Sequence, residues 1–281
     1  MSNWFRNGKH LRGVPVDDRA FHYGDGLFET VAIRNGQPRL WDLHLRRLRK
    51  GCDVLRLEMP DADDLLNSLS AALSDVSSGS HDCTVKLLVS AGPSARGYAR
   101  RVPTRAEVYI GVFAAAPIAQ PAYQDGVDTI ICDTKLAVNS VTAGCKTLNR
   151  IEQVLARTEC LESGVFEGFT LDAEGRLICG TMSNVFTVSD DLITTPLLER
   201  CGVEGVMRQF VLDTLRQGGR EVSVRDMDQS ELMAADEVFL CNSQFGIVPV
   251  RRCGEKHWGQ HRVTQSVMSV LGGNGIRECI R

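Results

Sequence analysis

Long apolar segments are missing from this chain of 281 residues, although hydrophobic residues make up 43% of it. No apolar run approaches the ~20 residues that a membrane-spanning helix needs. The first residues, Met-Ser-Asn-Trp-Phe-Arg-Asn-Gly-Lys, contain no apolar core of a secretion signal. These absences argue against a membrane protein and lead us to expect a cytoplasmic one.

An excess of charge of one sign is also missing. Lysine and arginine number 32 and aspartate and glutamate 35, for a net charge of −3, so we expect no nucleic-acid partner and no membrane surface. None of the ten cysteines stands in Cys-x-x-Cys spacing, which disfavours a zinc cluster and favours reduced thiols. His257 and His261 are four apart on a possible helix, but no third ligand is evident. We expect surface histidines there and no metal.

The chain is long enough for one large or two medium domains. Residues 115–122 contain two prolines and no periodic pattern, which is typical of a linker. We expect an N-terminal domain over residues 1–116, a linker over 117–122 and a C-terminal domain over 123–281. Hydrophobic spacing predicts strands over 27–33, 84–90, 107–114, 127–132 and 237–244, a hairpin around 172–175, and helices over 43–55, 61–75, 206–217 and 263–271.

One lysine stands in the stretch Ala-Gly-Cys-Lys-Thr-Leu-Asn-Arg, residues 143–150. Leu148 and Ile151 open a helical spacing, so we expect Lys146 at a helix N-terminus. The positive helix end and partial burial would lower the pKa of Lys146 from the ~10.4 of free lysine. A neutral amine can attack carbonyls or act as a base. The alternative is a solvated lysine. A phosphate-binding loop is excluded, because Asn139 stands where it requires glycine.

The same stretch resembles the lysine segment of the fold-type-IV pyridoxal-phosphate enzymes. This family contains branched-chain and D-amino-acid transaminases and aminodeoxychorismate lyases, and the Lys-x-Leu-Asn-Arg form is most similar to the lyases. Other motifs of the family occur along the chain in the family's order. They include Gly-Asp-Gly-Leu-Phe-Glu-Thr at 24–30 and Gly-x-x-x-Asn-Val-Phe at 180–186. The resemblance implies an α+β protein with a smaller N-terminal α/β domain and a larger C-terminal domain built on a mixed sheet or barrel.

The resemblance also implies pyridoxal 5'-phosphate as the cofactor, held covalently by Lys146. It assigns the phosphate to Arg47 of the His-x-x-Arg-Leu motif, and the planar fork of an arginine suits a phosphate. The glycine before the predicted helix 206–217 would leave the N–H groups of Val206 and Met207 for the same anion. Ser243 matches a family position that hydrogen-bonds the phosphate.

Substrate contacts are implied for three residues. Phe28 stands where the D-amino-acid transaminases usually carry a tyrosine, which counts against that reaction. Arg96 and Tyr98 form the Arg-Gly-Tyr of a loop over 91–101, similar to the lyases and expected to be mobile and basic. A dicarboxylate would favour arginines at the mouth of its site. Thr30 is a candidate for protonating the leaving group.

One position departs from the family. A glutamate that pairs with the protonated pyridine nitrogen of the cofactor usually lies five residues before the asparagine of Asn-Val-Phe. With Asn184 as reference, that residue here is Cys179, a thiol that is mostly neutral and a weak donor. Glu174 is expected in a hairpin turn and is a poor substitute. With a thiol at this position, the pyridine ring of the cofactor would be a weaker electron sink. This disfavours transamination more than elimination.

The first choice of activity is therefore an aminodeoxychorismate lyase, in which the Lys146 amine removes a proton and pyruvate leaves. The alternatives are a D-amino-acid or branched-chain transaminase on the same scaffold, and a binding protein without catalysis. The resemblance further implies a homodimer, because related enzymes complete each site with a loop of the partner subunit.

Overall fold

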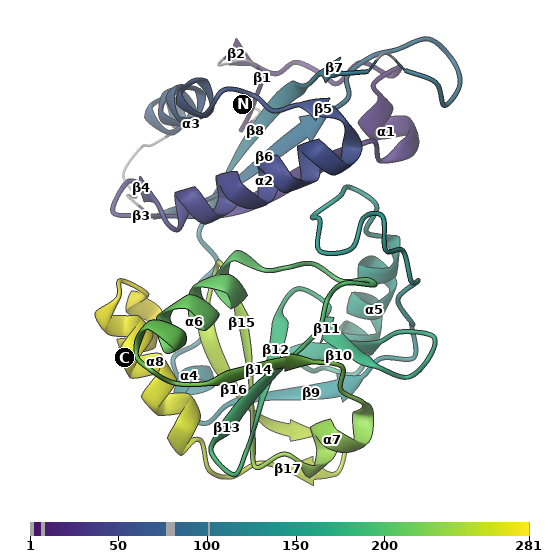
Figure 1. The fold of residues 1–281 in the computed structure, drawn as a ribbon. Coiled ribbons are helices and arrows are strands. Elements are labelled where there is room, and N and C mark those ends of the chain that lie inside the picture. Colours follow the sequence, from purple (N-terminus) through teal and green to yellow (C-terminus); the bar gives the residue numbers. More distant parts are fainter. Residues whose placement is uncertain (1–2, 7–8, 77–81, 101, 281) are drawn as a thin grey trace. The chain divides into compact units, whose positions relative to one another are not determined.

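The computed structural model describes residues 3–6, 9–76, 82–100 and 102–280. Contacts within the chain divide it into two compact units (Figure 1). The first unit comprises Met1–Ala116 and Cys145–Asn149, and the second comprises Pro117–Gly144 and Arg150–Arg281. The segment around Lys146 therefore belongs to the first unit, although it lies in the second half of the sequence.

In the described residues, the first unit forms a six-stranded sheet in which every neighbouring pair is antiparallel. The structure confirms the strands that the sequence predicts over 27–33, 84–90 and 107–114. In spatial order the strands are β2 (Lys9–His10), β1 (Trp4–Arg6), β8 (Glu107–Ala114), β6 (Cys83–Ser90), β3 (Gly26–Arg34) and β4 (Gln37–Pro38). A separate two-stranded sheet pairs β5 (Leu57–Glu58) with β7 (Thr104–Arg105).

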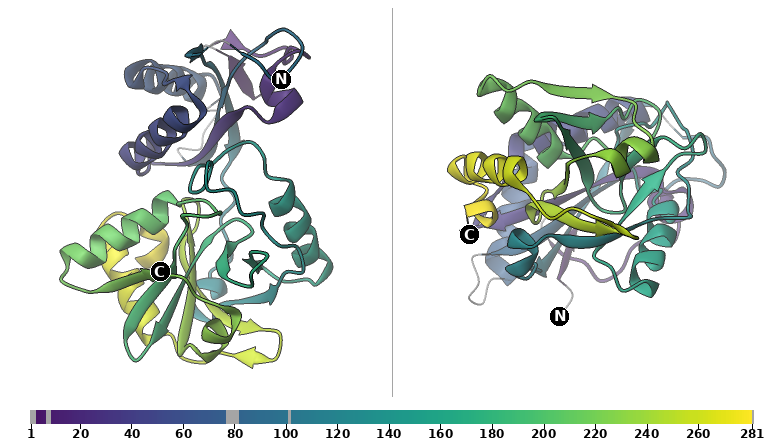
Figure 2. Two further views of the ribbon diagram at one scale, coloured as in Figure 1. Left: turned by 45° about the vertical axis from the view of Figure 1, so that its right-hand side comes forward. Right: turned by 90° about the horizontal axis from the view of Figure 1, so that it is seen from below.

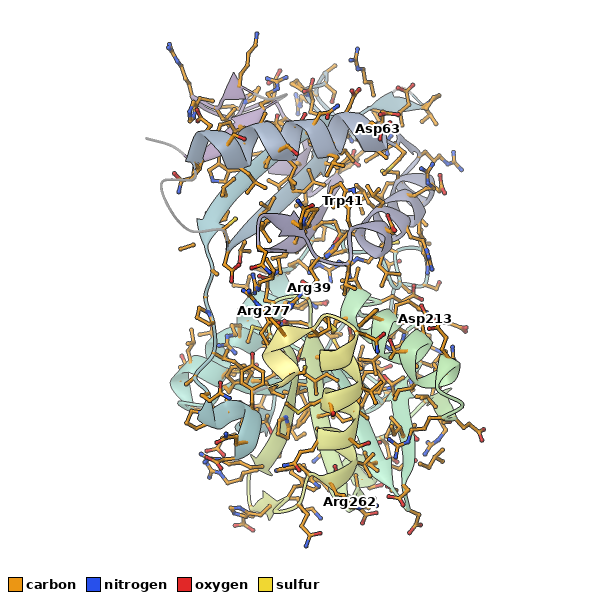
Figure 3. The ribbon with its side chains drawn as sticks, turned by 90° about the vertical axis from the view of Figure 1, so that its left-hand side faces the viewer. Arg39, Trp41, Asp63, Asp213, Arg262 and Arg277 are labelled. Atoms are coloured by element: carbon orange, nitrogen blue, oxygen red, sulfur yellow. The ribbon has the colours of Figure 1, made fainter. Side chains whose placement is uncertain are left out.

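Two long helices, α2 (Trp41–Leu55) and α3 (Ala62–Val76), cover one face of this sheet (Figure 2). A Cβ atom at Gly51 would lie 2.7 Å from Leu27 Cδ2, so the glycine is what lets α2 approach β3 closely. Trp41 packs against the core at the start of α2, whereas Asp63 lies on the surface of α3 (Figure 3). The short helix α1 (Arg19–Tyr23) precedes β3.

The second unit is built on a mixed sheet of nine strands among the residues described. Strand β9 is parallel to both β10 and β16, and β13 is parallel to β14, while the other neighbours are antiparallel. This sheet and the smaller first unit confirm the predicted α+β class. In spatial order the strands are β11 (Leu177–Gly180), β10 (Glu167–Leu171), β9 (Val127–Ile131), β16 (Gly246–Cys253), β15 (Glu237–Asn242), β12 (Asn184–Ser189), β13 (Leu192–Pro196) and β14 (Val222–Arg225), with β17 (Lys256–His257) on β16.

Helices α6 and α8 pack together on one side of this sheet and both contact β15, whereas α5 packs on β10 (Figures 1 and 2). Figure 3 labels Asp213 on α6 and Arg262 at the start of α8. The short helix α4 contains the last two residues of the predicted linker. The helices are α4 (Pro121–Gln124), α5 (Ile151–Glu162), α6 (Val206–Gln217), α7 (Gln229–Ala234) and α8 (Arg262–Gly273), followed by the 3-10 helix η1 (Arg277–Ile280).

The expectation that a helix begins directly after Lys146 is wrong. Helix α5 begins at Ile151, because the intervening residues bond to β3 instead: Leu148 N donates to Gly26 O at 3.0 Å, and Thr147 bridges Leu27. The buried residues of α5 are Ala156 and Cys160, and its larger apolar residues face outward. Ile151 is 68% exposed. Val154 and Leu155 are also exposed.

The two histidines considered above do not share a helix. His257 lies in β17, and His261 is the N-terminal cap of α8. The expectation of a surface position is wrong for His261, which lies at the start of α8 with only 8% of its surface exposed. In the ranges that the structure describes, no three potential metal ligands gather, and no helix has both the length and the apolar character needed to cross a membrane.

Candidate active site

Lys146 lies beside β3 in the first unit. Phe28 N donates to the carbonyl oxygen of Lys146 at 2.9 Å, which ties the backbone of the lysine to the strand. The amine nitrogen lies 4.2 Å from the centre of the Phe28 ring, within the range of a cation–π contact. The structure therefore places two sequence-predicted site residues together. The amine thus lies over the ring of Phe28, whereas the helix that follows Lys146 in the chain begins only at Ile151.

Lys86 is a residue that the sequence reasoning missed. Its amine lies 5.1 Å from the centre of the same Phe28 ring. Lys86 pairs with Thr30 in the register of β6 and β3, and Thr30 shares a face with Phe28 because it is two residues further along. The available signal was a single charge inside the apolar strand Thr-Val-Lys-Leu-Leu-Val. This face thus carries two amines, a ring and a hydroxyl.

Arg47 lies on α2 and is held by a buried acid on β3. Its Nε donates to Glu29 Oε1 at 2.8 Å, and its Nη2 donates to Glu29 Oε2. The same Oε2 lies 2.6 Å from His44 Nδ1. Glu29 and His44 each have side chains 1% exposed, and the Arg47 side chain is 10% exposed. The predicted phosphate ligand is therefore one member of a buried three-residue network.

Burial alone would raise the pKa of Glu29, but the charge and hydrogen bonds of Arg47, with the hydrogen bond from His44, outweigh it and lower that pKa to about 2. Burial lowers the pKa of His44, against the opposing pull of Glu29. A neutral imidazole beside an ionised carboxylate carries its proton on Nδ1 and donates it to Glu29. At neutral pH the network is then one carboxylate, one guanidinium and one neutral ring.

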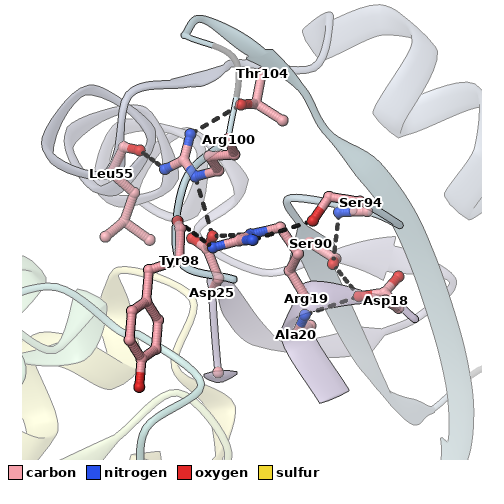
Figure 4. Close-up of polar contacts among 12 residues, drawn as sticks. Asp18, Arg19, Ala20, Asp25, Leu55, Ser90, Ser94, Tyr98, Arg100 and Thr104 are labelled. Atoms are coloured by element: carbon pink, nitrogen blue, oxygen red, sulfur yellow. Dashed lines mark hydrogen bonds and ion pairs between the residues drawn. The ribbon is translucent and has the colours of Figure 1, made fainter. Parts of the chain in front are cut away.

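The loop after β6, residues 91–101, is bonded to the rest of the unit through two arginines. Both donate to one oxygen, Asp25 Oδ2 (Figure 4). Arg19 Nε donates to it at 2.8 Å and Arg100 Nε at 3.0 Å. Arg19 also donates to Gly97 O at 2.9 Å and to Tyr98 O at 2.8 Å. Backbone carbonyls of the loop are thus held by charge-assisted bonds.

The expected basic loop is exposed at Arg96 and largely buried at Arg100. The Arg100 side chain is only 15% exposed and is engaged in bonds, and Arg101 lies outside the described residues. Arg96 and Tyr98 do face solvent, with Tyr98 86% exposed. The Tyr98 ring lies 5.4 Å from the ring of Tyr23 on α1. The loop therefore has hydrogen-bonded carbonyls at Gly97 and Tyr98, while its two predicted substrate residues face outward.

In the second unit, the start of α6 is free of side-chain capping. Its N-terminal cap is Gly205, which offers no side chain to the first-turn N–H groups of Val206 and Met207. A Cβ at Gly205 would lie 2.0 Å from Asn184 Oδ1, and Asn184 Nδ2 donates to Val203 O at 3.0 Å. Asn184 thus shapes the turn into the helix and requires glycine at its last position.

Ser243 follows the end of β15, against which α6 packs. The turn is closed by Asn242 Oδ1, which accepts from Gln244 N at 2.8 Å and from Phe245 N at 3.0 Å. Asn184 pairs with Cys241 in the register of β12 and β15. The end of β15 and the start of α6 therefore meet at Asn184, as the predicted phosphate site in this unit requires.

Cys179 lies on β11 and is 7% exposed, with Thr170 of β10 opposite it. Thr170 Oγ1 donates to the Cys179 carbonyl at 2.9 Å and lies 3.5 Å from its sulfur. The two glutamates closest to Cys179 in the sequence are engaged elsewhere. Glu174 is in the turn, ion-paired to Arg176 and 67% exposed. Glu167 is fully buried and holds the loop after β11, accepting from Thr181 N at 3.0 Å and from Ser183 Oγ at 2.7 Å.

Comparison with known proteins gives a consistent result. The family model of amino-transferase class IV matches residues 26–253. The chain is 38% identical to the aminodeoxychorismate lyase of Vibrio harveyi over 246 residues, which is 87% of this chain and 89% of the relative. It is 27% identical to a putative branched-chain-amino-acid aminotransferase of Methanocaldococcus jannaschii over 252 residues, covering 88% and 86%.

A solved structure agrees with this ranking. The crystal structure of 4-amino-4-deoxychorismate lyase from Pseudomonas aeruginosa is similar with a TM-score of 0.91 at 38% identity, covering 97% of this chain and 99% of that one. Both units described above therefore have their counterpart in one known fold.

Proposed function

Because the chain belongs to the class IV aminotransferase family, we propose that it is a pyridoxal-phosphate enzyme that releases pyruvate from 4-amino-4-deoxychorismate and leaves 4-aminobenzoate. One observation carries the choice within the family. Identity to a lyase is 38% over 87% of the chain, against 27% to a branched-chain aminotransferase over a similar length. Cys179 supports the same choice, because elimination depends less than transamination on a strong electron sink.

The residues fit the cofactor by the chemistry of their donors. Lys146 offers the amine to which the aldehyde would be joined. The start of α6 offers N–H groups that no side chain caps, and Arg47 offers a guanidinium. Anions bind at such helix starts and to such forks. We propose that Arg47, Val206, Met207 and Ser243 hold the phosphate and that Cys179 lies at the pyridine nitrogen.

The chain just before Lys146 is bonded to the turn that precedes α6. Gly144 N donates to Gly202 O at 3.1 Å, and Glu204 N donates to Gly144 O at 3.0 Å, so Gly144 is fixed to the turn that leads into the helix. Lys146 follows two residues later. With ~3.8 Å between successive Cα atoms, its Cα lies within about 7.6 Å of the Gly144 Cα.

Pyridoxal phosphate, when bound, draws electrons from the carbon that carries the substrate's nitrogen. The Lys146 amine would take the proton from that carbon, and the neighbouring carbon–oxygen bond would break to free the enolpyruvate. A proton added to the enolpyruvate completes pyruvate, and the ring becomes aromatic. Phe28, Arg96 and Tyr98 would contact the substrate, and Arg96 would pair with a carboxylate.

The proposal is tested by assaying purified protein, loaded with pyridoxal phosphate, on two sets of substrates. With 4-amino-4-deoxychorismate we expect equal amounts of 4-aminobenzoate and pyruvate. With D-alanine or branched-chain amino acids plus 2-oxoglutarate we expect little glutamate. Glutamate formation without 4-aminobenzoate would replace the lyase with a transaminase, and no product in either assay would favour a binding protein.

The proposed enzyme is a cytoplasmic homodimer that takes a small-molecule substrate. The dimer is supported by the likeness to enzymes whose sites are completed by the partner subunit, and by the frequency of two-fold dimers among soluble enzymes. Sedimentation should give about twice the mass of one chain, and an active monomer at assay concentration would contradict the dimer.

A further inference from the structure

Arg208 is a buried cation in the first turn of α6. It is 6% exposed, its Nε donates to Thr195 Oγ1 at 3.2 Å, and its Nη2 donates to Pro196 O at 3.0 Å. Both acceptors are neutral, and within the described ranges no carboxylate is ion-paired to Arg208. A charge removed from water without an opposite charge raises the free energy of the folded state. An anion supplied from outside the chain would relieve that cost.

Burial lowers the pKa of Arg208, and the charge of Glu204 opposes that effect only in part. The direction is the one expected for a cation that has lost its water. A guanidinium nevertheless stays protonated in proteins, so the side chain keeps its positive charge while lacking an ionic partner.

The position of this charge coincides with the proposed phosphate site. Arg208 is the third residue of α6, and helical side chains lean toward the N-terminal turn. That turn carries the uncapped N–H groups of Val206 and Met207 and the positive end of the helix dipole. The guanidinium itself is bonded to Thr195 and Pro196 at the end of β13, so its charge acts on the turn at a distance.

We propose that Arg208 is an electrostatic positioning residue for the cofactor phosphate, whose charge at the start of α6 balances a buried guanidinium that forms no ion pair with a carboxylate in the described part of the chain. The inference rests on the proposed function and adds to it a residue that does not contact the phosphate. It also explains why an arginine is buried against neutral acceptors, where an apolar residue would otherwise be cheaper to bury.

The test separates charge from hydrogen bonding. Arg208→Gln keeps donors and loses the charge, whereas Arg208→Lys keeps the charge and loses the fork. Arg216→Gln is the matched control, since it removes an exposed arginine from the last turn of the same helix. Two quantities are measured on apoprotein: the rise in Tm with inorganic phosphate, and the Kd values of pyridoxal phosphate and of pyridoxal, which lacks the phosphate.

We expect Arg208→Gln to lose the phosphate-dependent rise in Tm and to bind pyridoxal phosphate about tenfold more weakly, with the Kd of pyridoxal unchanged. Arg208→Lys and Arg216→Gln should match the wild type. Equal weakening in the Gln and Lys variants would assign Arg208 a structural bond, and wild-type affinity in both would show that its charge plays no part. Either result overturns the proposal.

If Arg208→Gln does not fold, Arg208→Lys decides alone, because a tenfold loss in the variant that keeps the charge also overturns the proposal. None of these measurements needs turnover. A wild-type protein that binds pyridoxal phosphate but lacks lyase activity would count against the proposed reaction and leave Arg208 standing. A wild-type protein that binds neither pyridoxal phosphate nor inorganic phosphate would overturn both.

Discussion

Glu29 and Arg47 form a two-point ion pair across α2 and β3, with Arg47 Nε 2.8 Å from Glu29 Oε1 and Nη2 bonded to Oε2. The residue predicted to bind phosphate is thus oriented by an acid 18 positions earlier in the chain. A bidentate pair fixes the plane of a guanidinium as well as its place. The pair therefore has consequences for stability and for cofactor binding that can be measured apart.

The first prediction concerns acid. The pKa of Glu29 is lowered from 4.5 to about 2, so the native state favours the carboxylate and gains stability above the unfolded pKa. That gain, roughly 3 kcal/mol, is lost as the pH falls from about 4.5 through about 2. Urea unfolding at a series of pH values should show a steeper loss in this window for wild type than for Glu29→Gln. Parallel curves would mean that Glu29 does not titrate as described.

The second prediction concerns Arg47→Ala. Loss of a charge-assisted pair with the phosphate costs ~1.5–3 kcal/mol, which weakens cofactor affinity roughly tenfold to a hundredfold. The variant also leaves Glu29 buried without its cation, so Arg47→Ala with Glu29→Gln is the cleaner measurement of affinity. Arg46→Ala, an exposed neighbour on α2, is the control. Titration showing wild-type affinity in the double variant would reduce Arg47 to a structural role.

The third prediction is that the cofactor is attached to Lys146. Borohydride reduction followed by peptide mapping should place a pyridoxyl group on this residue. Lys146→Ala should leave almost no turnover, since nucleophile and base are lost together. Lys86→Ala is the informative control, because its amine approaches the same Phe28 ring; it should still be labelled at Lys146. Label on Lys86 in the wild type would exchange the roles of the two lysines.

The fourth prediction concerns the shared carboxylate of Asp25. Asp25→Asn weakens two charge-assisted bonds to Arg19 and Arg100, so the loop that carries Tyr98 should exchange its amide hydrogens faster. Since a bond to a charged group contributes ~1.5–3 kcal/mol, we expect KM to rise roughly tenfold with a smaller change in kcat.

Glu107→Gln is the matched control for Asp25→Asn. Glu107 bonds to Arg6 at 3.1 Å in the same unit, whereas Arg19 and Arg100 donate to Asp25. Unchanged exchange of the loop amides in Asp25→Asn, or an equal rise of KM in both variants, would show that the Asp25 junction does not position the loop.

The fifth prediction concerns Cys179→Glu. A carboxylate at the pyridine nitrogen would strengthen the electron sink, so we expect pyridoxamine phosphate to accumulate with an amino acid roughly tenfold faster, with a smaller gain in lyase rate. Cys179→Gln, similar in size and neutral, is the comparison and should stay near wild type. If lyase turnover rose by orders of magnitude while transamination stayed flat, the natural chain would be an impaired lyase.

Much of the local structure follows from the sequence alone. The strands over 27–33 and 84–90 are readable because alternation with period two involves only near neighbours. The start of the helix at Val206 is readable from the glycine before it. The prediction that Lys146 is the reactive residue depends on its eight-residue motif, which says nothing about the groups that surround the side chain.

The groups that surround Lys146 were determined by the tertiary structure. Apolar spacing after Lys146 predicted a helix, but bonds to Gly26 and Phe28, over a hundred residues earlier, hold that segment beside β3. The junction of Arg100 and Asp25 spans 75 positions. Pairings at such separations depend on how the sheet is assembled, and no local period encodes them. The sequence alone thus indicated which residues to consider as site residues, and the tertiary structure determined which groups each of them contacts.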